Sequence, residues 1–335
     1  MPVYKGDEYL SEAVDSILNQ TFSDFEFIII CDNPTNETKD ILEKYQQSDS
    51  RIHVYYQERQ GLVKSLNMGL EFARGKYIAR MDADDISLPE RLQIQYDFLE
   101  TKPNIGLCGT WIENFGQKSG IHQLPITNED IKSKIFFGYA IAHPSVMIRK
   151  EIIDGAGGYN SHFNYIEDYE LWTRICDITE VYNIPKILLQ RRVHGGNITI
   201  GKQEKQFRLM REVHRRLILK IGINPTEYEQ NLHEYIYKGQ LSNLYSLDDA
   251  ESWLLKIILA NKGKRIYPEP AFSRTVEKYF YQTIMNLNSS LYGKYKKIIF
   301  SQIYKEAKYS PIPIIKRLAR LTIFNVKKVF YQKLG

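Results

Sequence analysis

The sequence predicts an α/β fold with a mostly parallel central sheet, followed by a mostly helical C-terminal region. Up to about residue 110, short apolar runs alternate with segments whose apolar residues recur at helical spacing, which is typical of a parallel sheet covered by helices. Acidic residues directly follow two of the apolar runs, at Asp32 and at Asp82. From about Glu204 onward, helical segments rich in Arg, Lys and Tyr continue without strand-like alternation. We therefore predict a domain over 1–200 and a helical region over 201–335.

The expected elements of the first domain follow one another in a regular order. Strands are expected at 25–31, 52–56, 77–81 and 105–110, and helices at 9–18, around 41–45, at 62–73 and after Pro89. The run from Phe25 to Cys31 is nearly all apolar, as in a strand buried on both faces. Gly75 fits a helix end and Pro89 a helix start. Ligands bind beyond the carboxyl ends of strands in such sheets, so Asp32 and the acidic residues after 77–81 are expected to share one site.

Composition limits the class of protein. With 43% hydrophobic and 25% charged residues, the chain of 335 residues is typical of a folded protein. The net charge of +5 is uneven, since residues 291–335 contain eleven Lys or Arg and one acidic residue, Glu306. Three widely spaced cysteines suit a reducing compartment. No apolar run approaches the ~20 residues that cross a bilayer, and no signal-peptide layout opens the chain, so a cytoplasmic location is expected.

The stretch 77–85 ends in three carboxylates, at Asp82, Asp84 and Asp85. Carboxylates placed together after a buried strand repel one another and need a compensating cation. Asp82 and Asp84 would share one side because side chains alternate along a strand. Such a pair can face a divalent metal that carries a diphosphate. A lone Asp-x-Asp is more often a solvated turn, but the preceding strand favours the metal site.

Several blocks, in this order, resemble family 2 glycosyltransferases. They are Met1-Pro2-Val3-Tyr4 and the segments 16–22, 75–85, 143–147, 157–159 and 167–172. The resemblance covers roughly the first 200 residues and fades after Arg192-Val193-His194. It implies the Rossmann-like, nucleotide-sugar-binding GT-A fold and a metal-dependent inverting transferase that uses Mn²⁺ or Mg²⁺. The expected donor is a nucleotide sugar, UDP-linked, and the expected acceptor is a glycan or a lipid-linked molecule in bacterial surface-polysaccharide assembly.

The resemblance also implies the residues of the donor site. Asp32 matches the aspartate that accepts an N–H of the base; a helix cap is the structural alternative, and both roles are compatible. Pro2 and Tyr4 match the start of the nucleotide pocket, where Tyr4 could stack on the base. Lys64 and Arg192, with Arg191 beside it, could add positive charge near the phosphates.

The acidic block and one histidine match the family's metal site. The resemblance places Asp82 near the ribose and gives Asp84 as a ligand of the metal. His194 matches a histidine that approaches the metal or the diphosphate. Asp85 is expected to order the turn.

The resemblance assigns the general base to Asp168. An inverting transfer needs a carboxylate that takes the proton of the attacking hydroxyl, which contributes ~10²–10⁴ in rate. Glu167 is expected to hold sugar or acceptor hydroxyls, and Leu171 and Trp172 to anchor the segment in the core. An acidic helix start favoured by the helix dipole is the structural alternative. His143 is either structural or part of the acceptor site.

One departure from the family concerns the first strand. Family members have a short strand before the Pro-x-Tyr segment, and this chain begins at Met1-Pro2. Without it, backbone groups inside the sheet would remain unpaired. The resemblance therefore implies either a start upstream of Met1 or another segment that completes the sheet.

The basic tail alternates apolar and basic residues over 311–331. This pattern is typical of an interfacial helix on anionic lipid and equally of a helix packed on its own domain. No recognition motif accompanies the charge, so nucleic acid is not an expected partner.

Three other classes of protein compete with this prediction. A processive membrane synthase would need transmembrane helices and a Gln-x-x-Arg-Trp signature, which the sequence lacks. A nucleotidylyltransferase would need a glycine-rich loop near the N-terminus. The alternative that remains is a catalytically silent subunit that binds nucleotide sugars and scaffolds a glycan-assembly complex.

Overall fold

The computed structural model describes residues 1–4, 8–195, 202–287 and 301–303. The chain forms two compact units, one made of residues 1–131 and 138–210 and the other of residues 132–137 and 211 onward. The domain boundary predicted near residue 201 and the basic tail over 311–331 both lie outside the described residues.

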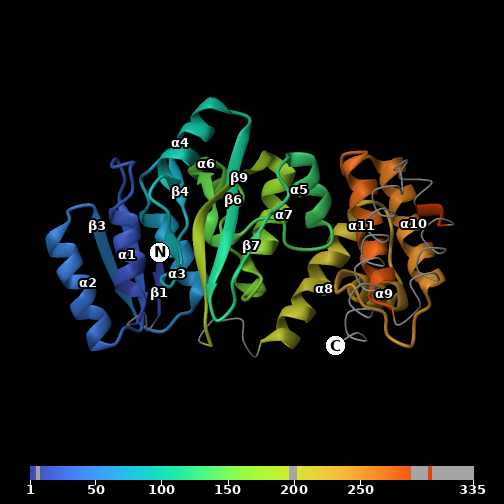
Figure 1. Ribbon diagram of the computed structural model, residues 1–335, viewed down its shortest axis with the longest axis horizontal. Helices are drawn as coiled ribbons and strands as arrows, with labels where there is room; N and C mark the ends of the chain where they lie inside the picture. The colour runs from blue at the N-terminus through green and yellow to red at the C-terminus, as the bar shows by residue number, and fades with distance from the viewer. Residues whose placement is uncertain (5–7, 196–201, 288–300, 304–335) are drawn as a thin grey trace, which may run out of the picture. The chain divides into compact units, whose positions relative to one another are not determined.

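Helices and strands alternate through most of the first unit (Figure 1). In chain order the structure contains β1 (Pro2–Val3), α1 (Leu10–Leu18), β2 (Phe27–Asp32), α2 (Asn36–Ser48), β3 (Ile52–Gln57), α3 (Leu62–Phe72), β4 (Tyr77–Ala79), β5 (Ile86–Ser87), α4 (Arg91–Thr101), β6 (Ile105–Gly116), β7 (Gly120–His122), α5 (Asn128–Ile135), the 3-10 helix η1 (His143–Ser145), β8 (Met147–Arg149), α6 (Lys150–Gly155), the 3-10 helix η2 (Ser161–Phe163), α7 (Glu167–Ile178), β9 (Glu180–Val193), α8 (Gln203–Lys220), α9 (Glu227–Tyr237), α10 (Leu247–Lys264) and α11 (Ala271–Met285).

The predicted α/β class is confirmed. The sheets contain antiparallel strands in addition to the predicted parallel ones. Strands β1, β2 and β3 form a parallel sheet in that order. The second sheet has the order β4-β8-β6-β9-β5, with β7 paired to β6. Its long central pair, β6 and β9, is parallel, whereas β4, β5, β7 and β8 pair in antiparallel fashion. Figure 1 shows β6 and β9 as two long neighbouring arrows.

The first-domain helices form where the periodicity predicted them. Helix α1 buries Leu10, Val14 and Ile17, which recur at helical spacing and contact the core formed with β1 to β3. Two terminal residues differ from the prediction. Helix α3 ends at Phe72, three residues before Gly75, and α4 begins at Arg91, two residues after Pro89.

The second unit is helical in its described part. Helices α9 and α10 each begin with a capping box, at Thr226 and Ser246, which satisfies backbone donors that the first turn leaves open. Phe136 and Phe137, from the short segment 132–137, are fully buried in this unit, where Phe136 packs edge-on against Phe272. Among the described residues, no helix is long and apolar enough to span a bilayer.

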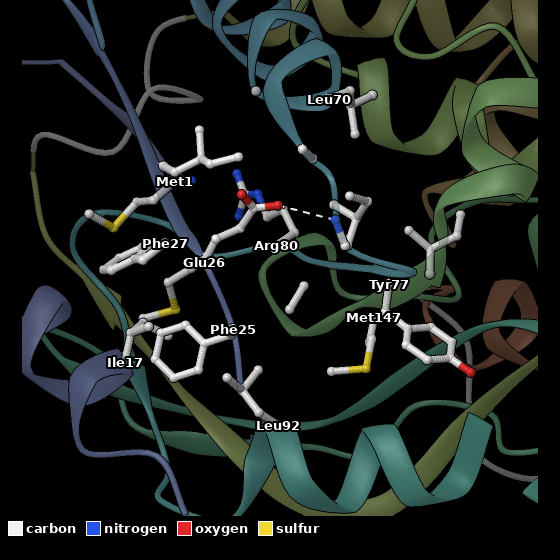
Figure 2. A pocket seen from close by; sticks show the side chains of 18 of the residues that line it. Met1, Ile17, Phe25, Glu26, Phe27, Leu70, Tyr77, Arg80, Leu92 and Met147 are labelled. Atoms are coloured by element: carbon white, nitrogen blue, oxygen red, sulfur yellow. Dashed lines mark hydrogen bonds between the residues drawn. The ribbon is translucent and has the colours of Figure 1, made fainter. Parts of the chain in front are cut away.

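A cavity of about 880 Å³ lies inside the first unit, where one strand of a continuous sheet would be. It is lined by residues of β2 and β4, by α3 and by Met1, and β1 and β4 are the edge strands of their two sheets. Strand β1 pairs with β2 only from Ile30 onward. The α-amino nitrogen of Met1 donates to the carbonyl of Ile28 at 2.8 Å. Figure 2 shows aromatic and methionine side chains, among them Phe27 and Met147, around the cavity.

This cavity is the physical counterpart of the short first strand. A strand supplies backbone donors and acceptors on both sides, and β1 provides them over two residues only. Burial, and then the charge of Arg80, lower the pKa of the Met1 α-amino group to about 5.

Candidate active site

Three carboxylates gather in the turn that follows β4. Oxygen atoms of Asp82, Asp84 and Asp85 all lie within 4.8 Å of one another. The turn is held at both ends, because Arg80 N donates to Val146 O at 3.0 Å and β5 pairs with β9 immediately after it. The chain therefore keeps like charges close together in a fixed loop.

The end of β9 meets this turn and brings His194 and Arg192 into contact with it. His194 Nε2 lies 2.9 Å from Asp84 Oδ2. The backbone N–H of Arg192 donates to Asp85 Oδ1 at 2.9 Å, and Arg192 Nε donates to the carbonyl oxygen of Asp84 at 3.0 Å. Two segments more than 100 residues apart thus form one site, in which Asp85 orders the turn.

The electrostatics of the carboxylates fit a divalent cation. Burial, followed by the charges of Asp82 and Asp84, raises the pKa of Asp85 to about 8. Burial and the charge of Asp82 also raise the pKa of Asp84. Asp85 Oδ2 is buried and has no hydrogen-bond partner among the described residues. Carboxylate oxygens with an imidazole nitrogen are ligands that Mn²⁺ and Mg²⁺ accept, and such an ion would relieve the repulsion.

Asp32 is buried at the carboxyl end of β2 and binds the loop before α3. Its carboxylate accepts the backbone N–H groups of Gln60 and Gly61 at 2.7 and 2.9 Å, and Gln57 Nε2 at 3.1 Å. Asp32 does not cap α2, because Thr35 does so through the N–H of Thr38. The helix-cap alternative for Asp32 is therefore replaced by a loop contact.

The other residues predicted for the nucleotide-sugar site lie on separate elements. Pro2 pairs with Ile30 in the sheet. Tyr4 is 41% exposed, and the guanidinium carbon of Arg59 lies 5.6 Å from the centre of its ring. Lys64 is exposed on α3, and among the described residues no contact joins it to the three carboxylates.

The guanidinium of Arg192 is bound by the protein itself. It forms an ion pair with Glu12 and lies between the rings of Tyr9 and Phe115, with centroid distances of 4.3 and 4.4 Å. Arg191 points elsewhere and donates to Asn114 Oδ1 at 3.0 Å. Arg192 therefore stiffens the end of β9 beside the carboxylates.

Glu167 and Asp168 occupy the first turn of α7. Asp168 Oδ1 accepts the N–H of Tyr169 at 2.8 Å, and Glu167 Oε2 accepts that of Tyr165 at 2.7 Å. Burial, and then the charge of Glu167, raise the pKa of Asp168 to about 7. A carboxylate with that pKa is partly ionised at neutral pH and can accept a proton. Leu171 and Trp172 are fully buried, as expected.

His143 lies in the interior beside this segment. Its Nε2 is 2.8 Å from the hydroxyl of Tyr159, and burial lowers the pKa of His143 well below its usual range. The main chain of Tyr159 is in turn bound by the side chain of Asn67 at both its N–H and its carbonyl. These contacts fit the structural alternative for His143.

Sequence reasoning did not single out Arg59 or Arg80. Arg59 lies beside Tyr4, and its position one residue before the Asp32-bound loop could have drawn attention to it. Arg80 forms an ion pair with Asp82 from two residues earlier in the chain, and the only signal was its place inside the block 77–85.

The chain is similar in sequence to known glycosyltransferases. The sequence model described as "Glycosyl transferase family 2" matches residues 1–155. The O-antigen biosynthesis glycosyltransferase WbnJ of Escherichia coli is 37% identical over 201 residues, which is 58% of this chain and 78% of that protein.

Solved structures share the fold. S. aureus TarS 1–349 in complex with UDP-GlcNAc matches with a TM-score of 0.56 and 16% identity, over 84% of this chain and 88% of that 1–349 chain. The mannosyltransferase PcManGT from Pyrobaculum calidifontis, in complex with GDP-Man and Mn²⁺, matches with a TM-score of 0.50 and 17% identity, over 89% and 85% of the two chains. This chain belongs to glycosyl transferase family 2 and is a glycosyltransferase with the GT-A fold.

Proposed function

We propose that the protein is a metal-dependent inverting transferase that moves a sugar from a nucleotide-sugar donor, UDP-linked, to a glycan or lipid-linked acceptor in cell-surface polysaccharide biosynthesis. The observation that carries the proposal is the contact of Asp84 with His194 inside a group of three carboxylates. WbnJ, by its name, acts in O-antigen biosynthesis. TarS is seen with UDP-GlcNAc and PcManGT with GDP-Man and Mn²⁺, which supports a nucleotide-sugar donor and a divalent ion.

The proposed roles are those that the resemblance to the family implies for these residues. Asp84 and His194 hold Mn²⁺ or Mg²⁺, and Asp82 lies at the ribose. Asp32, Pro2 and Tyr4 contribute to the nucleotide pocket, Lys64 and Arg192 add positive charge, and Glu167 holds hydroxyl groups.

In the proposed reaction Asp168 accepts the proton of the acceptor hydroxyl as that oxygen attacks the anomeric carbon. The bond from the anomeric carbon to the diphosphate oxygen breaks in the same step, which inverts the configuration at that carbon. Asp84 and His194 would hold a divalent ion, which would supply positive charge for the departing diphosphate. The N–H of Tyr169 binds Oδ1 of Asp168, and the other oxygen would take up the proton.

A thermal-shift panel tests the donor site. UDP, GDP and their sugars are added with and without Mn²⁺, and a ligand at ~100 times its dissociation constant should stabilise the fold by ~2.7 kcal/mol. We expect a metal-dependent shift with one nucleotide, and its loss in Asp84→Ala, which removes a carboxylate in contact with His194. Asp97→Ala, an exposed carboxylate on α4, is the control. An unchanged Mn²⁺-dependent shift in Asp84→Ala would contradict the assignment.

The silent-subunit alternative predicts binding without turnover. Clustered carboxylates repel one another, and burying them costs free energy. A protein without catalysis has no physical need to retain such a cluster. Release of nucleoside diphosphate by the wild type would exclude this alternative.

We further propose a cytoplasmic enzyme that attaches peripherally to the membrane. The attachment rests on the basic sequence over 311–331 alone. We expect the full chain to co-sediment with anionic vesicles at low salt and to dissociate at high salt, because exposed charges are screened. Absence of co-sedimentation at low salt would reject the attachment.

A further inference from the structure

The loop 156–159, which follows α6, is bound through its main chain by the side chain of Asn67. Asn67 Nδ2 donates to the carbonyl oxygen of Tyr159 at 2.8 Å, and the N–H of Tyr159 donates to Asn67 Oδ1 at 2.9 Å. One amide side chain thus pairs with both main-chain groups of a buried residue, as a neighbouring strand would. Asn67 lies on α3, 92 residues earlier in the chain, so this contact joins two distant segments.

Gly158 allows Asn67 to come this close to the loop. Its φ is +66°, in the left-handed region that glycine adopts without strain. A Cβ atom at this position would lie 2.8 Å from Asn67 Oδ1, so Asn67 would have to shift. The neighbouring Gly157 also has a positive φ, of +80°, but a Cβ atom there would meet nothing within 4 Å. Substitution of one glycine or the other therefore separates strain in the loop from loss of its contact with Asn67.

Helix α7 binds the same loop through Arg174. Nη2 of Arg174 donates to the carbonyl oxygen of Gly158 at 2.8 Å, and Nη1 donates to that of Ala156. The guanidinium also forms an ion pair, at 2.8 Å, with Glu170, whose side chain is only 1% exposed. Both charged residues lie on the helix whose first turn contains Asp168. A displacement of the loop would therefore change the position of the helix that carries the proposed general base.

Helix α3 is bound at its start to the proposed nucleotide pocket. It begins directly after Gly61, whose N–H donates to Asp32 Oδ2 at 2.9 Å. Asp32 is one of the residues proposed for that pocket. Asp32 thus holds the start of α3, Asn67 joins α3 to the loop 156–159, and Arg174 joins the loop to α7. These contacts form a continuous connection between the nucleotide pocket and the helix of the base.

We propose that Asn67 is a positioning residue of the transfer reaction, which fixes the helix of Asp168 relative to the nucleotide pocket. The inference rests on the proposed function. A general base must lie within hydrogen-bond reach of the attacking hydroxyl, and a displacement of about 1 Å can lower the rate about 10²-fold. Asn67 acts through the loop 156–159 and not on the substrates. Its loss should therefore change the rate of transfer and leave donor binding as it is.

Asn67→Ala removes both hydrogen bonds to Tyr159. We expect kcat to fall about 10- to 100-fold, while KM for the nucleotide sugar that the thermal-shift panel identifies stays at the wild-type value. Asn261→Ala is the matched control, because Asn261 binds the main chain of Tyr267 in the same way, at 3.0 and 2.8 Å, within the helical unit. This control should lower the melting temperature at least as much as Asn67→Ala and leave kcat unchanged.

A second pair of variants tests the contact with Asn67 still in place. Gly158→Ala puts a methyl group against Asn67 Oδ1 and should lower kcat as Asn67→Ala does. Gly157→Ala introduces similar backbone strain without that contact, so it should lower the melting temperature and retain kcat. If Asn67→Ala does not fold, the comparison of these two variants decides.

Two results would overturn the inference. One is a kcat of Asn67→Ala that falls no further than that of Asn261→Ala, or a raised KM with kcat unchanged, because Asn67 would then act on stability or on donor binding. The other is an equal kcat in Gly158→Ala and Gly157→Ala. A wild type that shows neither a nucleotide-dependent thermal shift nor turnover would instead reject the proposed function, before any variant is compared.

Discussion

Asp168→Asn is expected to lower the rate of sugar transfer by ~10²–10⁴, the contribution of a general base, while nucleotide-sugar binding stays unchanged. Asparagine has the same shape, and its carbonyl oxygen can still accept the N–H of Tyr169. It cannot take up the proton of the acceptor hydroxyl. Binding is followed by the thermal shift with donor and Mn²⁺, and turnover by release of nucleoside diphosphate.

The pH dependence gives this variant a second signature. With the pKa of Asp168 raised to about 7, wild-type turnover should fall about tenfold per pH unit below that value, because the base is then protonated. The variant should lack this limb. A carboxyl group whose pKa is raised on folding contributes least to the stability of the fold at high pH, because the same group ionises freely in the unfolded chain there. Asp168→Asn should therefore melt at or above the wild-type temperature at pH 8.

A matched control lies on the same helix. Asp177→Asn neutralises an exposed acid near the other end of α7 and should leave both turnover and the pH limb unchanged. Turnover that persists in Asp168→Asn would remove Asp168 from the mechanism, and it would leave the metal site untouched.

The parts of the fold that the sequence predicted are those in which one local pattern decides the structure. The nearly continuous apolar run before Asp32 became a buried strand, and the stripe over α1 became the inner face of a helix. Strand β9 lacked such a signal, because Pro185 interrupts it and its register with β6 shifts near Trp111. Its fourteen residues are held by tertiary pairing, which no local pattern reports.

The same distinction between local and tertiary signals applies to the candidate site. Motif order brought Asp84 and His194 into one prediction, and the structure places them 2.9 Å apart. Arg80 escaped notice because an arginine at the end of a strand is usually exposed, and only the packed structure shows it buried against Asp82. Likewise, Asp32 was expected at the base of the nucleotide, and its contacts with the loop before α3 depend on residues 25 or more positions away.

An apolar extension of the N-terminus is expected to raise the melting temperature by several degrees. Four residues, Val-Ile-Val-Ile, placed before Met1 can enter the cavity between β2 and β4. Burying four such side chains contributes about 6–12 kcal/mol, and ordering four residues costs about 4–8 kcal/mol. Backbone hydrogen bonds to the two open edges add about 1 kcal/mol each. A net gain of a few kcal/mol corresponds to roughly 5–10 °C in a domain of this size.

The control separates filling of the cavity from loss of the buried charge. An extension of Gly-Ser-Gly-Ser also converts the α-amino group of Met1, with its pKa lowered to about 5, into a neutral amide. Between pH 5 and 8 the unfolded parent chain binds a proton there that the folded chain does not, so the parent loses stability as the pH falls through this range. Both extensions should remove that loss, and only the apolar one should raise the melting temperature at pH 8. Equal melting temperatures of the two extended chains at pH 8 would show that the cavity does not accept a strand.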